Sequence, residues 1–490
     1  MLPITIMMTL LVMAGVIVAV KANATAKTLA VVAHVLAFAL SAVMLVRVAD
    51  EPISVVLGTE PWNFYVLVTP LDAFMVSLFI GVNLLITWAS LTMIDHDIEE
   101  SRIPMYYSLM CVLIATLCGV VIFENFINIL LLIELSSFAA AGIVIIKEKP
   151  ENMRAGLKYL ALSILGSSLI LMGIIILYFL TDYLSLTGIY ANLSYNFAGN
   201  EEAVRNALVF ITIGTALKSA LFPLHIWLPD AHSTAPSASS AALSSLVLKA
   251  YIFLYIKILH KAFGMDILMN DEVMSTVLFA VMAVGAAAMI FGSLRALMQT
   301  DIKRMIAYSS VAQIGYIFMG IGMGTRLGLF AAMFHMLCHA VTKAVLFLTA
   351  GSIIEQTGNR VIDKMGGVGV QMRVTMALFT VGALSMIGIP LFIGFNSKWF
   401  FVTSIIDTQY IWLLSVMAIS VLLNSSYYFP IVVRAFFGKD AMEAAQSPVS
   451  LERPMRDLAP IICLAFLVVA LAVLGGPINS YIRMGIEVIW

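Results

Sequence analysis

The chain has 490 residues, of which 62% are hydrophobic and only 11% are charged, and its formal net charge is -1. Soluble globular domains carry about 25% charged residues, so water is not the main solvent of this protein. The near-neutral charge includes no basic arm, which argues against nucleic acid as a partner. Together with a mean hydropathy of +1.03, this composition predicts an integral membrane protein whose surroundings are the lipid bilayer.

Apolar segments long enough to cross a bilayer, which takes about 20 residues, follow one another along the whole chain. The first lacks the charged leader and cleavage site of a signal peptide, so we expect a retained span. The sequence thus predicts an all-α polytopic membrane protein with about fourteen spans. Their approximate ranges are 3–20, 28–46, 71–94, 105–122, 126–146, 157–180, 204–221, 237–258, 273–294, 302–321, 327–353, 374–400, 411–437 and 458–478.

The distribution of lysine and arginine between the loops predicts the orientation. The loop 147–158 carries four basic residues, whereas the long segments 49–69 and 181–202 carry none. Basic loops remain on the cytoplasmic side of a membrane. We therefore expect 147–158 in the cytoplasm, the two long segments outside and both chain termini external, in a multi-pass protein of the cell membrane.

The four cysteines lie inside apolar segments, and none belongs to a CxxC or related metal-ligand pattern. We interpret them as packing thiols. The sequence contains no iron–sulfur, haem or nucleotide motif. We expect no cofactor, no metal and no catalytic residue for redox or hydrolytic chemistry in this chain.

Each half of the chain contains one apolar segment that combines a proline with a lysine. Lys218 and Pro223 occur in GTALKSALFPL, and Pro390 and Lys398 occur in GALSMIGIPLFIGFNSKWF. Paired interrupted helices are typical of transporters that are built from inverted repeats. The two segments therefore favour a transporter with an internal repeat.

We single out seven of the ionisable side chains within the predicted spans, which lie at mid-span or beside a proline break. An ionised side chain at the centre of a span costs about 2.5–3.5 kcal/mol on insertion scales, so such residues are rare and are usually functional. We predict that they form a path for proton translocation. The residues are Glu134, Lys218, Lys249, His335, His339, Lys343 and Lys398.

Lys218 and Glu134 have two interpretations. They either form a structural ion pair between two helices or transfer protons. Desolvation disfavours the charged form of a lysine and a neighbouring carboxylate stabilises it, so making and breaking their contact would load and unload a proton. Lys249 and Lys398 extend the line, although a lone lysine near a helix end can instead extend its ammonium group to the membrane surface.

His335, His339 and Lys343 are spaced at i, i+4 and i+8, which keeps them near one helix face over about 12 Å. Histidine titrates near neutral pH and is suited to relaying protons between lysines. Two alternatives are packed, hydrogen-bonded histidines and a metal site. The segment HMLCH has the histidine spacing of a metal site, but it lacks an adjacent glutamate and an evident third ligand.

A polar stretch with three prolines, FPLHIWLPDAHSTAPSASSA, separates two of the spans. Irregular backbone at membrane depth is tolerated only where protein or a water-filled cavity surrounds it. His225, Asp230 and His232 in this stretch are candidates for connecting the buried line to the cytoplasm. A purely structural loop explains them equally well.

At these residues the sequence resembles the antiporter-type subunits shared by respiratory complex I, Mrp cation/proton antiporters and membrane-bound hydrogenases. The resemblance covers about residues 71–437 and rests on four segments in the family's order. They are KSALFPLHIWLPDAHSTAPSASSA, TDIKRMIAYSSVAQIGYIFMGIG, HMLCHAVTKAVLFLTAG and GALSMIGIPLFIGFNSKWF.

The resemblance implies fourteen helices, two inverted five-helix repeats, broken helices seven and twelve, and a proton path across the middle of the membrane. Helices one to three would occupy residues 1–104, the repeats 105–258 and 259–437, and helix fourteen with its preceding loop 438–490. It also implies the helix that carries each site residue. Glu134 and Lys218 would pair between helices five and seven, Lys249 would lie on helix eight, His335, His339 and Lys343 on helix eleven, and Lys398 on helix twelve.

The chain is similar in length to the D-type subunit of an Mrp antiporter or its hydrogenase counterpart, and a lysine at position 398 differs from branches with glutamate there. Its partners would be other membrane subunits and, in a redox pump, subunits carrying Fe–S or Ni–Fe centres. One carboxylate among ammonium and imidazole groups suits H+, because Na+ prefers several oxygen ligands. The alternatives are a stand-alone solute carrier, which needs a recognition pocket, and a structural anchor without transport.

Overall fold

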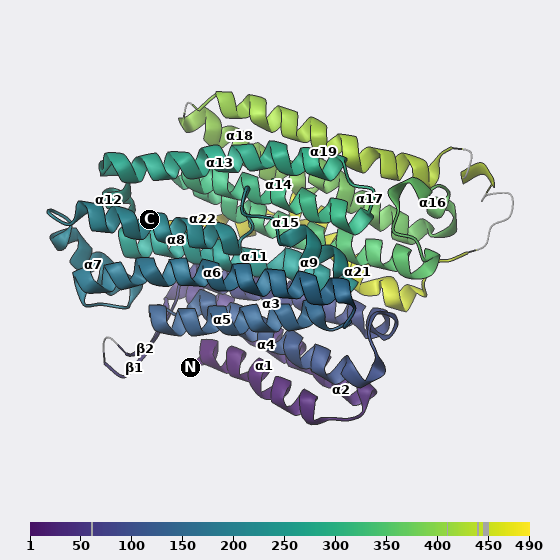
Figure 1. The fold of residues 1–490 in the computed structure, drawn as a ribbon, viewed down its shortest axis with the longest axis horizontal. Helices are drawn as coiled ribbons and strands as arrows, with labels where there is room; N and C mark the ends of the chain where they lie inside the picture. Colours follow the sequence, from purple (N-terminus) through teal and green to yellow (C-terminus); the bar gives the residue numbers. More distant parts are fainter. Residues whose placement is uncertain (60–61, 409, 439–440, 444–449) are drawn as a thin grey trace.

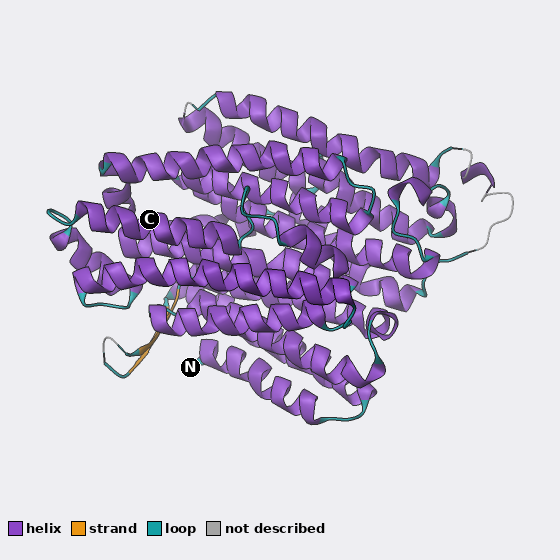
Figure 2. Ribbon diagram, viewed as in Figure 1, coloured by secondary structure: helices purple, strands orange, loops and turns teal. Residues whose placement is uncertain are grey.

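A computed structural model describes the chain except residues 60–61, 409, 439–440 and 444–449. Most of its helices run side by side along the longest axis of the molecule (Figure 1). Within the described residues, twelve helices are long and apolar enough to cross a membrane. Two interrupted helices, α8/α9 and α17/α18, complete the fourteen predicted spans. The prediction of an all-α polytopic protein is confirmed, as Figure 2 also illustrates.

The first part of the chain forms long helices and one hairpin. Its elements are α1 (Leu2–Ala19), α2 (Asn23–Asp50), β1 (Ile53–Leu57), β2 (Phe64–Val68), α3 (Pro70–Asp97), the 3-10 turn η1 (Glu100–Arg102), α4 (Ile103–Ile122), α5 (Phe126–Ile145), α6 (Pro150–Thr181) and the short α7 (Leu186–Asn196). The two strands pair antiparallel.

The middle of the chain contains the first interrupted helix and a long buried helix with two π-helical stretches. Its elements are α8 (Glu201–Lys218), α9 (Leu228–Thr234), α10 (Ser237–Ala242), the π stretch η2 (Leu243–Val247), α11 (Leu248–Lys257), the π stretch η3 (Ile258–Phe263), α12 (Met265–Asn270), α13 (Glu272–Leu297), α14 (Ile302–Gly322) and α15 (Arg326–Thr357).

The last part contains the second interrupted helix. Its elements are the 3-10 turn η4 (Ile362–Lys364), α16 (Val368–Gln371), α17 (Arg373–Ile387), α18 (Ile393–Thr408), α19 (Trp412–Phe436), α21 (Met455–Val473) and α22 (Gly476–Ile489). The final predicted span, 458–478, thus corresponds to α21 and the start of a separate terminal helix.

Polar caps fix where several membrane helices begin. The side chains of Asn125, Asp301 and Thr325 accept backbone N–H groups in the first turns of α5, α14 and α15, which satisfies donors that lipid cannot. Asp271 caps α13 in the same way and also accepts hydrogen bonds from Arg205. The Arg205 guanidinium lowers the pKa of the Asp271 carboxyl.

Proline and glycine produce the two interruptions. Helix α8 ends five residues before Pro223, and α17 ends next to Gly388, two residues before Pro390. Proline has no N–H group to donate to the helix ladder. Gly388 has φ +95, and a Cβ at this position would lie 2.7 Å from Cδ of Lys398. A larger residue is therefore excluded there both by the backbone conformation and by the lysine that packs on it.

The hairpin, the α4–α5 turn and the start of α7 lie at one end of the molecule, on the left in Figure 1. Isolated bridges join Val66 to Phe123 and Asn125 to Ser185. Because α5 starts at this end, the loop after it, with Lys147, lies at the opposite end. The described parts of the segments 49–69 and 181–202, which carry no basic residue, therefore lie at the end of the molecule opposite Lys147. The hairpin and α7 within them are not predicted from the sequence.

Candidate functional site: a buried row of lysines and histidines

Four lysines from four different helices lie in the interior of the protein. Their exposed fractions are 0–7%, and none of them reaches the surface from a helix end. We call these residues the lysine row: Lys218 on α8, Lys249 on α11, Lys343 on α15 and Lys398 on α18. Burial of an ammonium group is costly unless polar atoms replace its water. The surroundings of each lysine therefore show how it is held.

Lys218 is held by hydroxyl groups and not by a carboxylate. Its Nζ donates to Ser137 Oγ at 3.0 Å and to Ser163 Oγ at 2.8 Å, and it lies 4.9 Å from the centre of the Tyr251 ring. These groups come from α5, α6 and α11. The lysine is the last residue of α8, where the negative end of the helix dipole also stabilises a cation.

Glu134 does not contact Lys218 directly in this structure. Within the described residues it forms no ion pair, although its charge acts electrostatically on the lysine. The carboxylate is partly exposed beside Leu131 and Leu135, which are 60% and 51% exposed on α5. The predicted ion pair between Glu134 and Lys218 is therefore not formed in this structure. The ammonium group of Lys218 donates its hydrogen bonds to Ser137 and Ser163 instead.

Lys249 and Lys343 are both fully buried. The ammonium group of Lys249 donates to the carbonyl oxygen of Ser244, which lies in the π-helical stretch η2. Lys343 donates to the carbonyl oxygen of Ile306 at 2.9 Å and to the hydroxyl of Ser309. The two lysines interact electrostatically. Neither pairs with a carboxylate among the described residues, and the oxygen atoms that their amines contact belong to neutral groups.

The histidines of α15 are buried between these lysines and Lys398. Nδ1 of His335 lies 2.7 Å from Ser397 Oγ, and the His335 and His339 ring centres are 6.2 Å apart. Neither ring nitrogen of His339 has a hydrogen-bond partner in the described part of the chain. The same residues include no group of three or more His, Cys, Asp or Glu side chains arranged for a metal ion. Both imidazoles interact electrostatically with Lys249 and Lys343, and His335 does so with Lys398 as well.

Lys398 lies at the second helix interruption. Its Nζ donates to the carbonyl oxygens of Met386 at 2.9 Å and Ile387 at 2.6 Å, at the end of α17, and it lies 5.5 Å from the Tyr316 ring centre. The free carbonyls of a helix end attract a cation. Lys218 and Lys398 are thus each stabilised at the carboxyl end of a half-helix.

The three candidates in the proline-rich stretch have different surroundings. His232 is 0% exposed, and its charge neighbours include Lys249 and Lys343 of the lysine row. Asp230 is held at the surface by Lys158 at 2.7 Å and Arg304 at 3.0 Å. His225 stacks on Phe222, 5.5 Å between ring centres. The structure brings only His232 of these three to the buried row.

A second set of buried charges is not among the residues predicted from the sequence. Lys257 and Lys261 lie 3.0 and 2.8 Å from Glu124, and 3.7 and 3.8 Å from Asp72. We call these four residues the charged clasp. Lys257 also donates to the carbonyl oxygens of Val121 and Phe123. The sequence feature that could have indicated the charged clasp is the i, i+4 spacing of Lys257 and Lys261 at the end of a predicted span.

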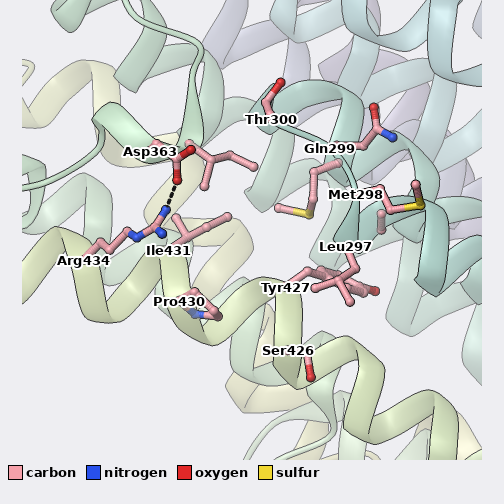
Figure 3. Close-up of a pocket in the computed structure, with 13 residues that line it drawn as sticks. Leu297, Met298, Gln299, Thr300, Asp363, Ser426, Tyr427, Pro430, Ile431 and Arg434 are labelled. Atoms are coloured by element: carbon pink, nitrogen blue, oxygen red, sulfur yellow. Dashed lines mark hydrogen bonds and ion pairs between the residues drawn. The ribbon is translucent and has the colours of Figure 1, made fainter.

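A surface pocket of about 290 Å³ lies apart from the lysine row. Figure 3 shows its labelled residues, which come from the end of α13, the segment after it, η4 and α19, with an ion pair between Arg434 and Asp363. No residue of the lysine row lines it. The pocket therefore supplies no recognition site on the predicted path.

The fold and the site define a class of protein: a polytopic membrane protein with two interrupted helices and a buried row of titratable groups. Residues 123–424 match the family described as NADH:quinone oxidoreductase/Mrp antiporter, transmembrane. The chain belongs to this family, which confirms the resemblance seen in its sequence motifs.

Among relatives, NADH-quinone oxidoreductase subunit N of Desulforudis audaxviator is 32% identical over 443 residues, which cover 86% of each chain. Two solved structures share the fold. A chain of the membrane-bound sulfane sulfur reductase, an archaeal respiratory membrane complex, has a TM-score of 0.90 and 24% identity, covering 99% of this chain and 97% of that one. A chain of the Mrp complex from Dietzia sp. has a TM-score of 0.88 and 21% identity, covering 100% and 97%.

Proposed function

We propose that this chain translocates protons as one subunit of a multisubunit membrane complex, and that the lysine row with Glu134, His335 and His339 carries them. The observation that supports this most is the full burial of Lys249 and Lys343 without a carboxylate partner among the described residues. Structural lysines are normally paired, because an unpaired buried charge is strongly destabilising. A lysine that is protonated only for part of a cycle has no such requirement.

The proposed cycle begins at the two interrupted helices. Lys218 takes up a proton when Glu134 moves toward it and releases the proton toward Lys249 when the hydroxyls of Ser137 and Ser163 replace the carboxylate. His339 and His335 pass the proton between the central lysines and Lys398, because each imidazole nitrogen can accept or donate. This chain then needs no cofactor, and Na+, where it is exchanged, crosses through other subunits.

The assembly is either an Mrp-type Na+/H+ antiporter or the proton pump of a redox complex. The respiratory names of one relative and one structural neighbour support the second candidate. Purification of the intact complex followed by identification of its subunits distinguishes them. Co-purifying Fe–S or Ni–Fe subunits identify a redox pump, whereas small membrane subunits alone identify an antiporter.

We further propose that residues 105–258 and 259–437 form the two inverted repeats. In support, each range has an interrupted helix in fourth place. The first covers most of α4, α5, α6, α8/α9 and most of the helix from α10 to η3, and the second contains α13, α14, α15, α17/α18 and α19.

The proposed orientation has both termini outside the cell membrane and the loop 147–158 in the cytoplasm. Single cysteines introduced at Lys149 and at Ser194, within the opposite segment, should react with impermeant thiol reagents from opposite sides. Ser194 reacts first in intact cells, whereas Lys149 reacts only after the membrane is opened. Labelling of both from one side would contradict the topology.

The histidines are expected to affect the rate of transport and not assembly. His335→Ala or His339→Ala should reduce proton flux in vesicles by about tenfold or more, since a relay group contributes about 10²–10⁴-fold to proton transfer. The abundance of the complex should remain unchanged. Stoichiometric zinc in the purified complex, lost in either variant, would instead establish a metal site.

A further inference from the structure

Lys303 is a buried lysine that the lysine row does not include. It lies in the first turn of α14, is 3% exposed, and donates a hydrogen bond of 2.6 Å to the carbonyl oxygen of Ala235. The positive end of the helix dipole disfavours a cation in this position, and burial adds to the cost. The neighbouring residue Arg304 forms an ion pair with Asp230 at the surface.

The charged groups around Lys303 connect it to the surface of the protein. They are Lys147, Asp97, Arg360 and Asp301. Asp97 pairs with Lys147 and accepts the backbone N–H of Ser237 at 3.0 Å, and its side chain is 22% exposed. Asp97 and Lys303 therefore both hydrogen bond to the backbone at the junction of α9 and α10, Asp97 at Ser237 and Lys303 at Ala235. The Asp97 carboxylate is nearer to solvent than the Lys303 amine.

Lys303 also interacts electrostatically with His232 on the neighbouring helix α9. That imidazole is fully buried, and neither of its ring nitrogens has a hydrogen-bond partner among the described residues. Lys249, Lys303 and Lys343 all act on it electrostatically, and it in turn acts on His339. Because α9 packs on α14, near the middle of the bundle in Figure 1, His232 joins the surroundings of Lys303 to the lysine row.

We propose that Asp97, Lys303 and His232, in this order, form the path by which protons reach the lysine row from the end of the molecule that carries Lys147. This proposal rests on the proposed function and adds a route of uptake to it. A proton passes from solvent to the Asp97 carboxylate, then to the neutral amine of Lys303, and then to the free nitrogen of His232. No other bond is formed or broken. Asp230 and His225 lie outside this path.

Three substitutions at position 303 separate transfer from structural support. Lys303→Arg keeps the charge and the hydrogen bond to Ala235, but a guanidinium does not release its proton. Lys303→Met removes both the charge and the exchange. Lys303→His loses the charged hydrogen bond but retains a group that exchanges protons. For a transfer role, Arg and Met should both lower flux by about tenfold or more, and His should retain more flux than either.

The assay uses the complete complex in sealed vesicles, with subunit abundance and proton flux measured side by side. In Lys303→His, flux should depend more steeply than in the wild type on pH in the compartment at the Lys147 end, and not on pH at the other end. Arg304→Gln is the matched control in the same turn. It releases Asp230 and should leave flux within about twofold, as expected for a surface ion pair.

Several results would overturn the path. Wild-type flux in Lys303→Arg, or loss of the subunit from the membrane in all three variants, assigns Lys303 a structural role. Lost flux in Arg304→Gln assigns uptake to Asp230 instead. Lys218→Ala is measured in parallel: normal flux in Lys303→Met with lost flux in Lys218→Ala removes only the uptake path, whereas normal flux in both removes the proposed function.

Discussion

Lys218→Ala is expected to abolish coupled proton transport while the complex still assembles at normal abundance. The substitution removes the proton carrier from the end of α8, but it leaves behind only two serine hydroxyls that can hydrogen bond elsewhere. Ser163 already donates to Ser137 at 2.9 Å, so neither is orphaned. The measurement is proton flux in vesicles, normalised to the amount of this chain in the same membranes.

Glu134→Gln should reduce flux strongly but not completely, because it keeps the shape of the side chain and removes only the charge that attracts the ammonium group. Lys27→Ala is the matched control. Lys27 forms an ion pair with Asp95 at 2.6 Å at the surface, where such a pair is worth about 0–1 kcal/mol. Reduced abundance in Lys218→Ala, with normal flux per molecule, would identify a structural lysine.

Lys257→Met in the charged clasp should have the opposite effect, a large loss of the folded protein. The substitution leaves the buried Glu124 with one lysine and leaves two carbonyl oxygens without their donor. Breaking a buried ion pair in this way costs about 3–5 kcal/mol. We expect the abundance of the chain and its thermal stability in detergent to fall, whereas flux per assembled complex stays near that of the wild type.

A double variant that removes one positive and one negative charge tests whether an unpaired buried charge causes the loss of folded protein. Lys261→Met with Glu124→Gln removes one charge of each sign and leaves Lys257 beside Asp72. Its abundance should exceed that of Lys261→Met alone, since no unpaired charge remains. Normal abundance with lost flux in the single variants would instead place the clasp on the proton path.

The sequence predicts the architecture well because lipid leaves few alternatives. Apolar length locates the spans, and the prolines at 223 and 390 locate the two interruptions, since every backbone group in lipid must be satisfied within a helix or by a neighbouring group. The lysines near those prolines are equally conspicuous, because an ionisable residue in a span has an obvious cost.

Contacts between helices are less predictable. Asp230 and His232 are two residues apart, but only the second points inward, because α9 turns between them. Ser137 and Ser163 come from different helices, and nothing in either segment indicates that they hold Lys218. Lys303 resembles an ordinary loop cation next to Arg304 in the sequence, and only the packing of α9 on α14 buries it.

The central claim, that protons move along one continuous row through this chain, is tested most directly at Lys249. This residue lies in the first proposed repeat and interacts electrostatically with Lys343 in the second. The measurement is the change in internal pH of vesicles containing the purified complex with wild-type chain or with Lys249→Met, at equal complex content. The account predicts that the variant assembles and that its proton flux falls by about a hundredfold or more. Undiminished flux through an assembled Lys249→Met complex would contradict it.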